Sequence, residues 1–179
     1  MKRRWILTAI LLLGGTLAVR AGLPPTEGTA EAGWEKLKAL QGRWETTTPD
    51  GKKAWLTIEL VANGTALMER EEVPGDAERS NMVTMYHLDR DRLILTHYCM
   101  ANNQPRMRAA AYDPETRTLT FEFLDATNLK TPDDGHMRRV VFRFVDNDHF
   151  TSQWTFFKDQ KPVFDEEFKY ARVGSASKK

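Results

Sequence analysis

The sequence contains a single cysteine, Cys99, in 179 residues. An intramolecular disulfide is therefore excluded, and the protein does not belong to the small secreted scaffolds that depend on several such bridges. Its stability has to come from a packed core. A chain of this length can bury enough apolar surface to form one core as a single domain.

An excess of charge of either sign is also missing, because 26 Lys and Arg residues face 25 Asp and Glu residues. The first 21 residues hold four of the basic side chains and no acidic one, so the remaining chain is slightly acidic. Proteins that bind nucleic acids or anionic membranes normally carry a basic excess or a basic stripe. We therefore expect no nucleic-acid partner.

The chain lacks an apolar run long enough for a membrane-spanning helix. Its most apolar stretch, residues 5–19, has 15 residues, whereas a spanning helix needs about 20. A basic segment, Met1–Arg4, precedes this stretch, and Val19-Arg20-Ala21 ends it, which is the arrangement of a secretory signal peptide. We predict that residues 1–21 are removed, which leaves a periplasmic or secreted protein without a stable membrane anchor.

Repeats and βαβ units are absent from the sequence pattern. Apolar residues recur at helical spacing in residues 31–41, before Gly42, which predicts one short helix there. Alternation of apolar and polar residues, which is typical of strands, fills most of the chain that follows. The predicted strands are residues 43–48, 53–61, 65–73, 81–88, 92–100, 106–112, 117–124, 137–145, 149–157 and 163–172.

Most connections between these strands have the length of a hairpin turn. The predicted fold is therefore all-β, an up-and-down antiparallel β-barrel of about ten strands with one short N-terminal helix. The barrel spans residues 31–173. A flexible lead, residues 22–30, precedes it, and a disordered tail, residues 174–179, follows it.

The interior of such a barrel is found by asking which strand register collects apolar side chains on one face, because a slip of one residue exchanges the two faces. A three-residue loop at 146–148 places Phe142 and Trp154 inside. At residues 63–64, a three-residue loop with the glycine in the left-handed conformation places Arg70 inside.

The interior predicted in this way is apolar with a few polar groups, a composition typical of a small-molecule pocket. Arg70 in this interior favours an anionic lipophilic ligand. Alternatively, Arg70 pairs with Glu166, because an unpaired interior charge costs several kcal/mol. The predicted polar contacts are Arg70, Tyr86, His97, Glu166 and Tyr170, and the predicted walls are Met68, Phe121, Phe142, Trp154 and Phe168. We expect a secreted protein that binds a small hydrophobic or amphipathic molecule.

A short helix, then Gly42-x-Trp44 at the start of the first strand, then a meander of hairpins resembles the lipocalin-like, or calycin, group of β-barrels. The segments Thr96–Cys99 and Asn102–Met107 resemble, more narrowly, exported bacterial lipocalin-like proteins of unknown function. The resemblance covers residues 31–173. It implies that Trp44 closes the floor of the barrel and that the protein binds a small ligand, and it brings no activity.

His97 and Cys99 are two residues apart on one predicted strand, so both side chains project to the same face, as ligands of a metal or haem do. A haem or metal carrier that uses His97 is therefore a second interpretation, whereas the first requires no cofactor. A third is a structural or interaction protein whose barrel is filled by its own Phe and Trp side chains. Because no supporting Asn or Asp motif accompanies Cys99 and His97, we predict no catalytic residues and expect no enzyme.

Overall fold

A computed structural model describes residues 29–77, 80 and 82–174. The predicted signal peptide, residues 22–28 of the predicted lead and residues 175–179 of the predicted tail lie outside the described residues. Within the described part of the chain, no helix is long and apolar enough to cross a membrane.

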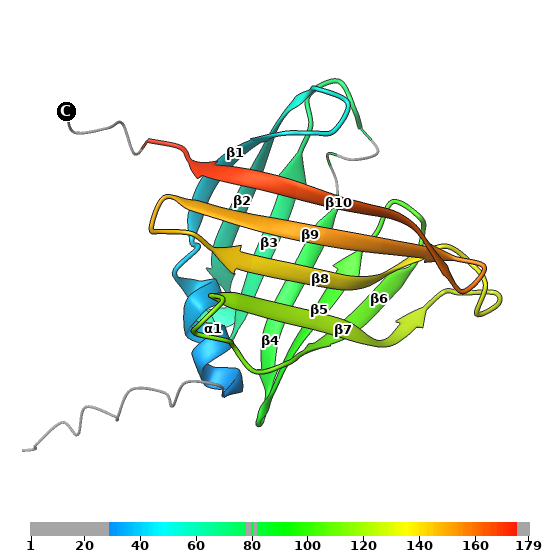
Figure 1. The fold of residues 1–179 in the computed structure, drawn as a ribbon, viewed down its shortest axis with the longest axis horizontal. Coiled ribbons are helices and arrows are strands. Elements are labelled where there is room, and N and C mark those ends of the chain that lie inside the picture. The colour runs from blue at the N-terminus through cyan, green and yellow to red at the C-terminus, as the bar shows by residue number, and fades with distance from the viewer. Residues whose placement is uncertain (1–28, 78–79, 81, 175–179) are drawn as a thin grey trace, which may run out of the picture.

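The helix α1 (Ala30–Lys38) begins one residue before the predicted one. Its start is fixed by Thr29, whose Oγ1 accepts a hydrogen bond from the Ala32 N–H at 3.2 Å. The buried side chains of α1 include Trp34 and Leu37, which belong to the same core as the barrel interior. Figure 1 shows α1 against one end of the barrel, which we call the closed end.

Ten antiparallel strands form the barrel. Each strand pairs with its neighbours in sequence, and the first pairs with the last, which closes the sheet on itself. The predicted fold class is confirmed. The strands are β1 (Gly42–Thr47), β2 (Lys53–Val61), β3 (Ala66–Glu72), β4 (Val83–Asp89), β5 (Arg92–Tyr98), β6 (Gln104–Ala109), β7 (Thr118–Thr127), β8 (His136–Phe144), β9 (His149–Lys158) and β10 (Lys161–Arg172).

Trp44 lies on β1 at the closed end and is completely buried. Its ring meets the Phe150 ring edge to face, with 4.8 Å between the centroids. Its indole Nε1–H donates a hydrogen bond to the Leu40 carbonyl at 2.7 Å, in the segment that joins α1 to β1. Trp44 therefore ties the helix connection to the floor of the barrel.

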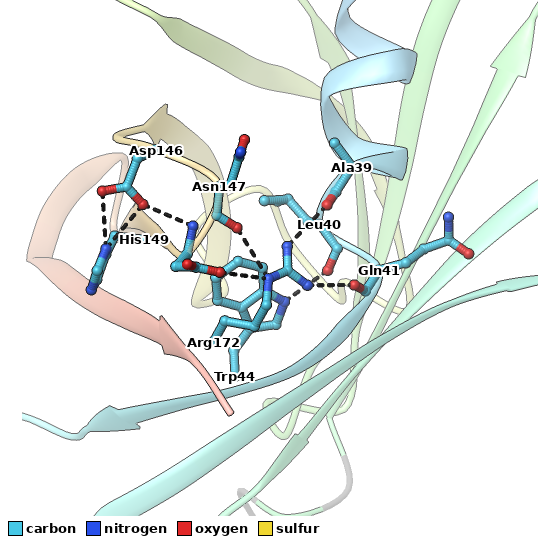
Figure 2. Close-up of polar contacts among 9 residues, drawn as sticks. Ala39, Leu40, Gln41, Trp44, Asp146, Asn147, His149 and Arg172 are labelled. Atoms are coloured by element: carbon cyan, nitrogen blue, oxygen red, sulfur yellow. Dashed lines mark hydrogen bonds and ion pairs between the residues drawn. The ribbon is translucent and has the colours of Figure 1, made fainter. Parts of the chain in front are cut away.

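Arg172 on β10 is the register partner of Trp44 and covers its ring, with the guanidinium carbon 4.0 Å from the centroid. The guanidinium donates hydrogen bonds to the carbonyl oxygens of Ala39 at 3.1 Å, Gln41 at 2.7 Å and Asn147 at 3.0 Å. We call these contacts of Arg172 the closing clamp (Figure 2). The clamp joins the helix connection, the β8–β9 loop and the seam between the first and last strands.

The predicted register is confirmed for the hairpins β4–β5 and β8–β9. Phe144 pairs with Phe150, which leaves the predicted three-residue loop at 146–148. The inner face of these four strands is buried and includes Thr84, Tyr86, Leu93, Leu95, His97, Val140, Phe142, Phe150, Ser152 and Trp154.

The register predicted for β3 is wrong by one residue. Val61 pairs with Ala66, so four residues, 62–65, connect β2 to β3 in place of the predicted three. The prediction used Gly64 as the one left-handed residue. In the structure, Ala62 and Asn63, in the short 3-10 turn η1 (Ala62–Gly64), have positive φ as well.

The additional loop residue exchanges the two faces of β3. Leu67 and Glu69 are buried, whereas Met68 and Arg70 lie on the outer face. Because β2 keeps its predicted orientation, with Leu56 buried, the error is confined to one strand. It nevertheless changes which charged residue enters the barrel.

Candidate ligand-binding cavity

The barrel is hollow at the end away from α1. The strand β5 runs from the end covered by α1 to the hollow end. Leu93, near its start, lies against Gly33 of α1, and His97, near its end, lines a cavity of about 490 Å³. Small-molecule sites commonly have volumes of about 300–1,000 Å³. Nearer to α1 the interior is filled by large, fully buried side chains, which include Trp44, Tyr86, Phe121, Phe142 and Phe150. The interior thus has a filled half and an open half.

Aromatic side chains form one wall of the cavity. They come from the inner faces of β9 and β10, which are neighbouring strands. Two of them, Phe156 and Phe164, stack with 5.3 Å between ring centroids and 7° between ring planes. The aromatic lining residues are Trp154, Phe156, Phe164, Phe168 and Tyr170. This wall offers flat apolar surfaces to a ligand.

Glu69 is the most deeply buried charged residue of the lining, with 8% of its surface exposed. Its Oε2 accepts a hydrogen bond from the Tyr86 hydroxyl at 2.7 Å. Burial raises the pKa of Glu69 to about 7; the hydrogen bond from Tyr86 offsets part of this effect, and the charge of Glu71 adds to it. Burial also raises the pKa of Tyr86 well above its ordinary value, so Tyr86 remains the donor.

His97 is buried beside Trp154, with 4.9 Å between the ring centroids. Its Nδ1 lies 2.9 Å from the Thr84 hydroxyl, and its Nε2 is buried without a hydrogen-bond partner among the described residues. Burial lowers the pKa of His97 to about 4, so the ring is neutral at physiological pH. A neutral imidazole with one unused ring nitrogen is able to bond a polar ligand group.

Three further groups with titratable side chains line the cavity: Glu71, Cys99 and Glu166. Glu166 projects from the same face of β10 as Phe168 and Tyr170, is half-buried, and makes no ion pair with any residue that the structure describes. Burial raises the pKa of the Cys99 thiol, which keeps it protonated and disfavours a nucleophilic role.

The charge of the lining differs from the sequence-based expectation. Arg70 is outside, with 55% of its side chain exposed and a guanidinium nitrogen 3.8 Å from a carboxylate oxygen of Glu59 on the neighbouring strand. Neither predicted role of Arg70 is correct: it does not enter the interior, and it does not pair with Glu166. Among the described residues, no lysine or arginine lines the cavity.

The remaining predicted contacts fall into three groups. The first group lines the cavity and comprises His97, Glu166, Tyr170, Trp154 and Phe168. The second group, Tyr86, Phe121 and Phe142, lies in the filled half. From there the Tyr86 hydroxyl donates its hydrogen bond to Glu69. Met68 joins Arg70 on the outer face. Two further lining residues, Glu69 and Glu71, were not predicted; a four-residue loop at 62–65 would have placed both inside.

The predicted metal or haem ligands His97 and Cys99 both line the cavity. No third ligand accompanies them: within residues 29–77, 80 and 82–174, no three His, Cys, Asp or Glu side chains are grouped so that they could hold a metal ion. The interpretation as a haem or metal carrier remains a prediction. An absorption spectrum and a metal assay of the purified protein test it.

No protein-family model matches the sequence, and no curated protein matches it. Among solved structures, the chain is similar to a protein of unknown function of the DUF3598 family from Nostoc punctiforme, with a TM-score of 0.51 and 14% sequence identity. The similarity covers 76% of this chain and 49% of that protein, so this chain spans about half its length. At this identity the two proteins share a barrel fold, and a shared fold does not establish a function.

Proposed function

We propose that this protein binds a small amphipathic molecule in the open half of its barrel. The observation that carries the proposal is the division of the interior. One half is filled by side chains, and the other is a cavity of about 490 Å³ with an aromatic wall and a few polar groups. The alternative interpretation was a structural or interaction protein whose barrel is filled by its own side chains. Such filling describes only the half of the interior nearer to α1, because a completely filled barrel would leave no cavity.

We also propose that the protein acts in the periplasm or outside the cell. The support is the basic start and apolar run of residues 1–21. We propose in addition that the protein is related to the calycins. This relationship is supported by the short helix, by Gly42-x-Trp44 at the start of β1 and by the burial of Trp44 at the closed end.

Blocking the mouth of the cavity should weaken the binding of a neutral amphipathic probe. Ala101 lines the cavity and is exposed, so Ala101→Trp adds a large side chain there without disturbing the core. We expect the dissociation constant of phenylnaphthylamine, measured by its fluorescence, to rise by about tenfold or more, which corresponds to about 1.4 kcal/mol.

Ala110 provides the matched control, because it is also exposed and lies just beyond β6, away from the cavity. Ala110→Trp should bind the probe as the wild type does. Absence of saturable binding by the wild type, or equal binding by both variants and the wild type, would overturn the proposed function.

A further inference from the structure

Carboxylate side chains line the cavity. Glu69 enters it from β3, and Glu166 enters it from β10. Since no described lysine or arginine lines the cavity, an anionic ligand would meet repulsion there and would find no described cation to pair with. The electrostatics of the described lining therefore favour a ligand that carries a positive charge.

Glu69 has capacity for a second partner. A carboxylate accepts hydrogen bonds at both oxygens, and the neutral Tyr86 hydroxyl bonds one of them, Oε2. A buried carboxylate is costly when no opposite charge or full set of hydrogen bonds compensates it. A cation in the cavity would provide that compensation.

Glu69 and Glu166 line the same cavity from two strands, β3 and β10, that β1 and β2 separate. Tyr170 follows Glu166 by four residues on the inner face of β10, and its pKa is raised first by burial and then by the charge of Glu69. Glu69, Glu166 and Tyr170 all line the same cavity. On β9, next to β10, Trp154 is the register partner of Glu166 and presents an aromatic ring, which attracts cations at its face.

An independent observation comes from His97, which is buried and lines the same cavity, and whose Nε2 has no partner among the described residues. When Nδ1–H donates to the Thr84 hydroxyl, Nε2 carries a lone pair and accepts a hydrogen bond. A protonated primary amine has three N–H donors. Its donors match the acceptors that Glu69, Glu166 and His97 provide.

From these contacts we propose that the cavity selects amphipathic molecules with a protonated amine headgroup, and that Glu69 and Glu166 are the counterions. The apolar part of such a molecule would lie against the aromatic wall of β9 and β10. This inference rests on the proposed function, because it names the chemical class of ligand for the same cavity.

Three probes with the same ring and different headgroups test the charge preference: naphthylmethylamine, naphthylmethanol and naphthoate. We expect calorimetric titration of the full chain at about pH 8 to show the amine binding about tenfold tighter than the alcohol, and naphthoate binding most weakly. Glu69→Gln keeps the size of the side chain and removes its charge. It should reduce the affinity for the amine several-fold towards that of the alcohol, with Glu166 retaining part of the preference, and leave the affinity for the alcohol unchanged.

Glu59→Gln is the matched control, because Glu59 is a half-exposed carboxylate on the outer face, paired with Arg70. It should leave all three affinities unchanged. Equal affinities for the three probes, or tightest binding of naphthoate, would overturn the inference and leave the proposed function standing, provided that Ala101→Trp still weakens binding. Failure of the three probes alone would overturn the inference, and the additional absence of saturable phenylnaphthylamine binding would overturn both.

Discussion

Replacing Glu69 by glutamine should raise the free energy of unfolding of the ligand-free protein by about 3 kcal/mol at about pH 8 and leave it nearly unchanged at about pH 4. Glutamine still accepts the hydrogen bond of Tyr86 but carries no charge. The gain at high pH is the cost that the wild type bears for an ionised, buried carboxylate.

The sign of this pH dependence follows from the two pKa values. Burial raises the pKa of Glu69 from 4.5 in an unfolded chain to about 7 in the folded protein. Between these values the folded state binds more protons than the unfolded state does. The contribution of Glu69 to stability is therefore fully present below pH 4.5 and is lost as the pH rises through about 7.

His97 should show the opposite dependence. Burial lowers its pKa from 6.5 to about 4, so the unfolded state binds more protons in that window. The stability associated with His97 is lost as the pH falls from 6.5 through about 4, again by about 3 kcal/mol. In the wild type the two dependences largely cancel between 4.5 and 6.5.

Urea unfolding at a series of pH values checks this prediction. For each variant, Glu69→Gln and His97→Gln, the quantity of interest is the difference in unfolding free energy from the wild type at the same pH. In this difference, the titration of other groups cancels. The difference should grow with pH for the first variant and shrink with pH for the second. A difference that does not vary with pH would show that the altered side chain does not titrate in this range.

Loss of the closing clamp should be the second large effect. Arg172→Met keeps an unbranched side chain over Trp44 but removes the donors to the carbonyls of Ala39, Gln41 and Asn147. We expect the free energy of unfolding to fall by about 3 kcal/mol, because hydrogen bonds from a charged donor contribute about 1.5–3 kcal/mol each and water partly replaces them at this half-buried position. Urea unfolding monitored by tryptophan fluorescence measures the loss.

Two further variants separate the guanidinium geometry from its charge. Arg172→Lys keeps the charge but cannot reach three carbonyls in different directions, so it should recover less than half of the loss. Asp148→Asn removes the acidic partner 3.4 Å from Arg172 and should change stability little, because this carboxylate is 46% exposed. If Arg172→Lys were as stable as the wild type, charge alone would account for the role of Arg172.

The positions of the strands could be predicted because alternation and turn residues agree along most of the chain. In the β8–β9 hairpin, most of the large aromatic residues share one face, and one register buries Phe142, Phe150 and Trp154. Local pattern and tertiary packing then favour the same pairing.

The orientation of β3 could not be predicted in this way, because its two faces have similar apolar content. One holds Leu67 and Glu69, and the other holds Met68 and Arg70. Loop geometry had to decide, and the loop uses a positive φ at Ala62, a conformation that alanine rarely adopts. The buried Glu69 also contradicts the usual rule of apolar interiors. Such contradictions are expected at functional sites.

The cavity could not be predicted from the strand register. Alternation shows that Phe142 and Phe168 both face inwards, but it does not show whether side chains meet in the middle of the barrel. Phe142 lies in the filled half, whereas Phe168 borders open space. The difference depends on position along the barrel axis and on which end α1 covers, and both are properties of the whole fold.

The pairing of β1 with β10 also bears on how the chain folds. Trp44 and Arg172 are register partners although nearly the whole barrel sequence separates them, and such non-local closure makes folding slow. Until β10 docks, the sheet has two unpaired edges that other chains could join. The outer face of β10 carries Asp165, Glu167 and Lys169, all exposed, and charges of this kind discourage pairing between chains. The last strand thus combines the residue that completes the barrel with charges that protect it from aggregation beforehand.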